Sequence, residues 1–202
     1  TDCVMDSGRV THVVFEGKGG ARALEGRYFL DSTGDGDLSA MAGVPMQMFP
    51  APTQPASLCF CLGGVDAMSI PKIRHELQGV NYHIEPLREG LLPLAERGEI
   101  PKFGGPWMCW MQSKDSVLVN MTRAEGDMAD ERDQTRLECQ LREDAHRLVR
   151  ALRENFEAFR SARILYTATQ VGVRETRHIR GVHILTGQEY AAAFHFPDAV
   201  GR

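Results

Sequence analysis

The sequence lacks both a long apolar run and a strong excess of one charge. No stretch approaches the roughly 18 apolar residues that a membrane-spanning helix needs, and no secretory apolar region opens the chain. Lys and Arg number 23 against 27 Asp and Glu, which gives a net charge of −4 over 202 residues. We therefore expect no membrane span and no electrostatic binding to nucleic acid.

Paired cysteines and metal-ligand spacings are also missing. The five cysteines form an odd set without a C-x-x-C pair, which is typical of a reduced, cytoplasmic protein. The acidic stretch from Asp31 fits the start of an EF-hand calcium loop, but Ala42 stands where that loop requires a bidentate Glu. We therefore expect no metal site.

A G-x-G-x-x-G turn is absent, although the chain holds 20 glycines. The informative glycines are Gly34 and Gly36, which follow the apolar residues 28–30 and precede helix-forming residues 38–42. This order predicts a strand, a tight turn and a helix. Glycine permits positive φ and close approach to the backbone, and a helix start leaves N–H groups unpaired. Both contact with a phosphate or ribose and an ordinary Gly/Asp-rich turn of an α/β protein fit these residues.

Two stretches of the chain resemble one known family. Residues 28–45 are similar to the internal "ATG" segment of FAD-dependent oxidoreductases with the glutathione-reductase type of dinucleotide fold, relatives of the fumarate reductase flavoproteins. Residues 171–186 resemble that family's Gly-x-Arg-Glu-x-Arg-x-x-x-Gly-x-x-x-Leu-Thr stretch. The two occur in the family's order and at about its spacing, so the resemblance covers nearly the whole chain.

The resemblance implies an α+β fold in two parts. Residues 1–49 would be the tail of a glutathione-reductase-like FAD-binding α/β domain, with a β-meander followed by strand, turn and helix. Residues 50–202 would form a substrate or cap domain of antiparallel sheet plus helices. Local patterns agree, because residues 4–15 and 23–30 read as a meander and four prolines between residues 45 and 55 mark a crossing.

Within residues 50–202, the pattern predicts both strands and helices. Short strand-like runs occur at 56–63, 107–111, 116–121 and 164–166, with further runs at 170–173 and 178–185. Ser69 begins a predicted helix that runs to about residue 79. Residues 129–159 predict one long amphipathic helix with an apolar stripe, and its charged residues, Asp144 among them, are expected on the solvated face. Thr186 and Glu189 predict a capping box for a short helix.

The cofactor residues follow from the resemblance. It implies that Thr33, Gly34, Asp35, Gly36 and Asp37 lie near the pyrophosphate and ribityl chain of FAD. The two aspartates at 35 and 37 would accept hydrogen bonds from hydroxyl groups, because like charge disfavours contact with phosphate.

The substrate residues form a second implied group. Asn120, Arg123, Arg174 and Arg177 are the candidates for holding an anionic substrate, since a guanidinium stays charged and can grip a carboxylate with two donors. Two alternatives stay open. Residues 120–123 can be an ordinary turn at a strand end, and the arginines near 174–177 can form an Arg–Glu ion pair that joins the two domains.

No catalytic acid or base can be assigned from the sequence, and His178 and His183 are the first candidates to test. The resemblance implies an enzyme that transfers a hydride between a small, anionic organic substrate and the flavin. Residue 1 reads as the interior of a strand, so we expect an internal fragment that needs the remainder of its own chain and does not hold FAD alone. A non-catalytic α+β binding or structural module is the alternative, and homo-oligomerisation stays open.

Overall fold

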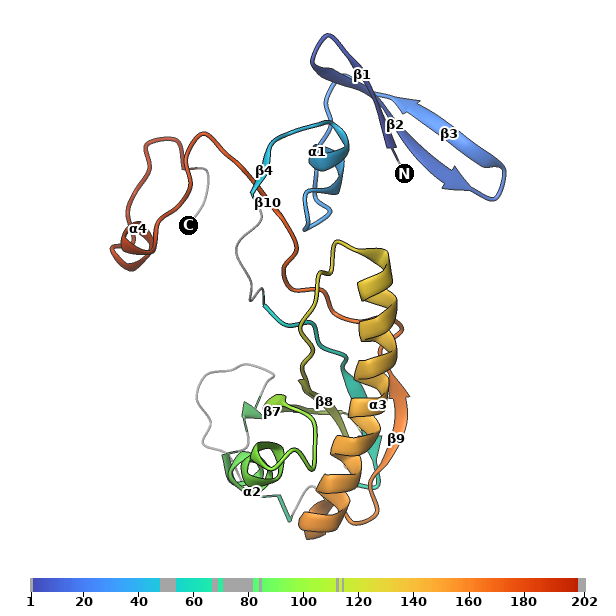
Figure 1. Cartoon of the computed structure of the whole chain (residues 1–202), viewed down its shortest axis with the longest axis vertical. Coiled ribbons are helices and arrows are strands. Elements are labelled where there is room, and N and C mark those ends of the chain that lie inside the picture. Colours follow the sequence, from blue (N-terminus) through green and yellow to red (C-terminus); the bar gives the residue numbers. More distant parts are fainter. Residues whose placement is uncertain are drawn as a thin grey trace. The chain divides into compact units, whose positions relative to one another are not determined.

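The computed structural model describes residues 2–47, 54–66, 69–70, 82–83, 85–111, 113 and 115–199. The chain divides into two compact units, Thr1–Phe49 with Arg177–Arg202, and Pro50–Thr176 (Figure 1). The family resemblance implies that residues 177–202 belong to the second part of the chain. The structure groups them with the first unit, because β10 (His178–Ile179) pairs antiparallel with β4 (Met46–Gln47).

The first unit begins with the predicted meander. Within residues 2–25, the strands β1 (Asp2–Asp6), β2 (Arg9–Gly17) and β3 (Gly20–Glu25) pair antiparallel in chain order. We call the turn that contains Gly34 and Gly36 the glycine turn. The helix predicted after it forms as α1 (Asp37–Met41). The predicted capping box of α4 (Gly187–Ala191) is confirmed, with Thr186 and Glu189 bonded reciprocally.

The strand predicted at residues 28–30 does not form. The segment has no regular structure, and Tyr28 and Leu30 are 94% and 89% exposed. A strand needs a neighbour to satisfy its backbone N–H and C=O groups, and no strand in the described part of the chain pairs with these residues. The runs predicted at 170–173 and 178–185 are likewise shortened, to an isolated bridge between Gly172 and Ser57 and to the two-residue β10.

The second unit is built on an antiparallel sheet, as predicted. Among its described residues, the strand order is β6-β7-β8-β5-β9. The strands are β5 (Phe60–Gly63), β6 (Tyr82–His83), β7 (Phe103–Trp110), β8 (Ser116–Thr122) and β9 (Arg163–Thr167). All four residues of β5 are buried because this strand lies between β8 and β9 and is covered on its faces. The helix expected from Ser69 to residue 79 falls mostly outside the described residues.

The helices of the second unit supply the rest of the core. They are α2 (Glu85–Glu96), α3 (Glu131–Asn155) and the 3-10 turn η1 (Glu157–Phe159). α3 packs against β8 and β9 (Figure 1). The predicted helix over 129–159 is thus shorter at both ends. Asp130 accepts hydrogen bonds from the N–H groups of Arg132 and Asp133 as N-cap, and Phe156 leaves the helix in an extended conformation.

One predicted solvated residue of α3 is buried. Asp144 belongs to the packed face, together with Leu141, Ala145 and Leu148. The prediction of a solvated carboxylate is wrong, because Asp144 follows Leu141 by three residues and precedes Leu148 by four, which is the spacing of one helix face. In the described ranges, no helix has both the length and the apolar character that crossing a bilayer requires.

Candidate functional site

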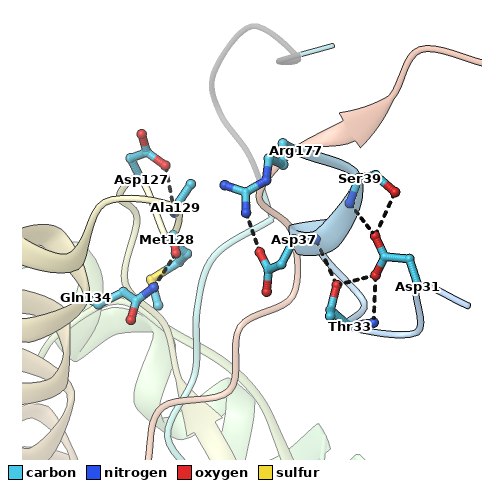
Figure 2. A network of polar contacts seen from close by, with 9 residues as sticks. All are labelled: Asp31, Thr33, Asp37, Ser39, Asp127, Met128, Ala129, Gln134 and Arg177. Carbon is cyan, nitrogen blue, oxygen red and sulfur yellow. Dashed lines mark hydrogen bonds and ion pairs between the residues drawn. The ribbon is translucent and has the colours of Figure 1, made fainter. Parts of the chain in front are cut away.

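The glycine turn of the first unit is organised by the carboxylate of Asp31 (Figure 2). Its Oδ1 accepts hydrogen bonds from the N–H and hydroxyl of Thr33, at 3.2 and 2.8 Å. Its Oδ2 accepts from the N–H and hydroxyl of Ser39, at 2.9 and 2.7 Å. These donors, the Ser39 hydroxyl foremost, hold the pKa of Asp31 far below its usual range. Asp31 therefore ties the segment before the turn to α1.

The two glycines of the turn differ in their surroundings. Both have positive φ, 87° at Gly34 and 65° at Gly36. A Cβ placed at Gly36 would touch the side chains of Ile179 and Met46 at 3.4 and 3.5 Å, so the inner side of the turn is packed. A Cβ placed at Gly34 would meet no described heavy atom within 4 Å. The backbone at Gly34 is therefore open to close approach by a ligand.

Asp37 and Arg177 connect the two segments that resemble the family, residues 28–45 and 171–186, which we call the family-like segments. Their side chains form an ion pair (Figure 2). β10 begins at the residue after Arg177 and pairs with β4, which follows α1 in the chain. Arg177 Nε is buried without a hydrogen-bond partner among the described residues. Thr33 Oγ1 also accepts a hydrogen bond from the N–H of Asp37 at 2.8 Å. Residues 140 positions apart in the chain thus stabilise one turn.

A hollow lies beside this turn within the first unit. Its volume is about 350 Å³, and its walls combine apolar side chains with the polar residues of the turn. The lining residues are Val13, Phe29, Leu30, Asp31, Ser32, Thr33, Asp37, Leu38 and Met41.

A second cluster surrounds Arg123 in the second unit. Arg123 Nη1 donates to Asn120 Oδ1 at 3.0 Å and to the Thr122 carbonyl at 2.6 Å, and the guanidinium lies 5.1 Å from the ring centroid of Trp107. A Cβ at Gly104 would come within 2.5 Å of Arg123 Nε, so the glycine leaves room for the guanidinium. The predicted neighbours Asn120 and Arg123 are thus brought together.

Like charge and burial act on the same cluster. Burial lowers the pKa of Arg123, and the positive charge of Arg174 lowers it further. Burial also raises the pKa of the Cys59 thiol, which the charges of Arg123 and Arg174 partly offset. Arg123 and Arg174 therefore act on one electrostatic environment, which favours an anion.

The two histidine candidates, His178 and His183, both belong to the first unit. His178 is an exposed residue of β10. His183 is also exposed, with Nε2 3.2 Å from a carboxylate oxygen of Glu189 and its ring 5.1 Å from that of Phe196. Glu189 is at the same time the N3 residue of the capping box of α4, whose N-cap is Thr186. His183 thus takes part in the local structure around α4.

A family model described as FAD dependent oxidoreductase matches residues 1–202. The chain belongs to the FAD-dependent oxidoreductase family. Comparison with curated proteins and with solved structures gave no match. FAD is accordingly the cofactor that the family implies.

The chemistry of the glycine turn can be compared with the parts of that cofactor. The open backbone at Gly34 and the adjoining hollow suit a flat or hydroxyl-bearing portion of a nucleotide. The carboxylates of Asp31 and Asp37 disfavour a pyrophosphate, and both are already engaged, by hydroxyl and N–H donors and by Arg177 respectively. The residues present therefore suit a hydroxyl-bearing part of FAD better than its pyrophosphate.

Sequence reasoning missed two residues of these sites, Asp31 and Gly104. The pairing of Asp31 with Ser39 had a partial signal, since Ser39 lies in the first turn of the predicted helix. Gly104 had none, because Arg123 is distant in sequence. Among the described residues, no group of three or more His, Cys, Asp or Glu side chains is arranged to hold a metal ion.

Proposed function

We propose that this chain belongs to an enzyme that transfers a hydride between a small anionic organic substrate and FAD, with the glycine turn against the cofactor. Bound FAD supplies the hydride acceptor or donor. The observation that carries the proposal is the union of the two family-like segments: Arg177 pairs with Asp37, and β10 pairs with β4. In this arrangement the backbone of Gly34 remains open to close approach by a ligand.

On the cofactor side, each residue of the turn has a distinct role in the proposal. Gly34 offers bare backbone, and Gly36 turns the chain toward α1. Thr33 and Asp37 hold the shape of the turn through their mutual hydrogen bond. Asp35 accepts a hydrogen bond from a hydroxyl group of the cofactor. The proposed arrangement is of the glutathione-reductase type, with the first unit as the FAD-binding part.

On the substrate side, the second unit supplies the cationic groups. Asn120 orients Arg123 through the 3.0 Å hydrogen bond, and Arg174 adds a second positive charge to the same environment. These groups would hold a carboxylate. Arg177, the fourth candidate, is engaged by Asp37, which favours the role of an internal ion pair over substrate contact.

For proton transfer we propose His178 and His183 as the candidate residues. Both side chains are exposed, and His183 Nε2 lies 3.2 Å from a carboxylate oxygen of Glu189. We further propose a cytoplasmic location, which the five free cysteines support.

The exposed apolar side chains favour a larger parent protein. Tyr28, Leu30 and Val182 are almost fully exposed, and among the described residues of the first unit no apolar side chain is buried. A stable domain normally buries a core of apolar side chains. We propose that other parts of the same polypeptide cover them, and that residues 1–202 alone neither hold FAD nor react.

Flavin retention tests this proposal. The protein at the length the cell makes it is expected to purify with about one FAD per chain, and residues 1–202 mixed with FAD and passed through a desalting column are expected to emerge without it. Flavin per chain is read from the visible absorption spectrum. Stoichiometric flavin on residues 1–202 would show that the piece is complete for binding. A colourless natural-length protein that FAD cannot reconstitute would instead support the non-catalytic module.

A further inference from the structure

A second pocket lies in the second unit beside α3, and we call it the α3 pocket. Its volume is about 540 Å³, and it opens next to the start of β7 and the end of β8. Its polar lining includes Lys102, Arg123, Gln140, Asp144 and Arg147. Phe103 and two prolines add apolar wall. It is thus large enough for a small organic molecule with one polar end.

Asp144 is the buried acceptor of this pocket. Its side chain is 7% exposed, and its recorded contacts are long: 3.5 Å to Gln140 Nε2 and 3.6 Å to Arg147 Nη1. Charge-assisted hydrogen bonds are usually about 2.7–2.9 Å, and a carboxylate can accept several of them. Within the described part of the chain, this carboxylate therefore keeps acceptor capacity toward the pocket. Burial raises the pKa of Asp144, and the long contacts with Gln140 and Arg147 offset this rise only in part.

Arg123 is the oriented donor of the same pocket. Both of its hydrogen bonds to described residues leave from Nη1, which keeps Nη2 as a donor for a ligand. The contact with Trp107 holds the guanidinium in place, so little side-chain freedom is lost when a ligand binds. Lys102 and Arg147 add positive charge, and the cationic lining residues outnumber the anionic ones, Glu125 and Asp144. The balance favours a carboxylate.

We propose that the α3 pocket binds a small carboxylic acid that carries a hydroxyl or amino donor beside the carboxylate, together with a short apolar part. Arg123 holds the carboxylate, Asp144 accepts the hydrogen bond from the donor, and Phe103 packs against the apolar part. This ligand would be the substrate class of the proposed function, and its assignment rests on that function for the role of Arg123. A hydroxy acid and an amino acid share this chemistry.

The direct test is binding to the natural-length protein by isothermal titration calorimetry. The probes are phenyllactate, phenylalanine and 3-phenylpropionate, which share a carboxylate and a ring and differ in the donor. At least one of the first two is expected to bind about 10- to 100-fold more tightly than 3-phenylpropionate, the range for a hydrogen bond to a charged acceptor. The stronger of the two identifies the donor as hydroxyl or ammonium.

Variants assign the two contacts. Asp144→Asn keeps the side-chain shape and is expected to remove most of the preference over 3-phenylpropionate. Arg123→Ala is expected to weaken all three probes, and Arg150→Ala, an exposed change on α3, to weaken none. Equal affinity for the three probes, an unchanged preference in Asp144→Asn, or no binding of any probe would overturn the proposal. Flavin content of each preparation is measured separately, so loss of the proposed redox function and loss of this binding are distinguished.

Discussion

At the scale of the residue, Asp31 connects the segment before the glycine turn to the turn itself and to α1 through four hydrogen bonds. Asp31→Asn is expected to lower the melting temperature of the natural-length protein at neutral pH, because the amide cannot accept the four hydrogen bonds from Thr33 and Ser39 equally well. The pKa of the carboxyl is lowered in the folded state, so its stabilisation is present above the unfolded value near 3.8. It is lost as the pH falls through the lower folded value.

The measurement is thermal unfolding of both proteins from neutral pH downward, with Ser32→Ala as the control. Ser32 is an exposed neighbour in the same turn. The gap between Asp31→Asn and the parent should narrow in acid, whereas Ser32→Ala should melt like the parent throughout. A gap that stays constant to acid pH would show that Asp31 does not act through its charge.

The residues also show how far the sequence leads. Gly34 and Gly36 could be recognised beforehand, because their type and spacing imply positive φ, which both adopt. The burial of Asp144 was predictable from helix periodicity but was obscured by its charge. The contact of Arg123 with Trp107 was not predictable, because the register of β7 on β8 decides it.

At the scale of the element, helices and strands with a periodic apolar pattern were predicted correctly, whereas short segments without a partner strand were not. α3 and the strands β7 and β8 follow from residue periodicity, since each buries one face within its own unit. The predicted strand at residues 28–30 had apolar residues but no partner strand among the described residues. The two-residue strands β4 and β10 are too short to leave a periodic signal.

The end of β5 gives a prediction at this scale. Gly64 has φ of 72°, and a Cβ there would lie 2.6 Å from the Ser161 carbonyl oxygen, a backbone atom that cannot move aside cheaply. Gly64→Ala is expected to cost about 2–4 kcal/mol of unfolding free energy from strain and overlap combined. Gly98→Ala is the matched control, with φ of 73° and open space around the Cβ. It should cost about 1 kcal/mol.

Urea unfolding of the natural-length protein, followed by tryptophan fluorescence, compares the two variants. Both tryptophans, Trp107 and Trp110, lie in β7 of the same unit as the two glycines. Equal losses for the two variants would mean that the strand end relaxes away from Ser161, against the packing described for β5.

At the scale of the whole molecule, the chain returns to its first unit after building the second. The sequence predicted the boundary near residue 49 but not the return of residues 177–202. That return brings the second family-like segment to the first through Arg177 and Asp37. A contact between residues so far apart in the chain has no local signature, so only a structure could supply it. The family assignment, by contrast, followed from the two motifs alone.

The central claim, that the glycine turn lies against FAD, is tested most directly by FAD affinity in Gly34→Ala and Gly20→Ala. The two glycines have matching φ, 87° and 91°, and a Cβ at either meets no described atom within 4 Å, so the two substitutions impose the same backbone strain. FAD is titrated into flavin-free natural-length protein. We predict that Gly34→Ala weakens FAD binding about tenfold or more, a loss of about 1.4 kcal/mol of binding free energy. Gly20→Ala should bind FAD as tightly as the unsubstituted protein. Equal FAD affinity in both variants would contradict it.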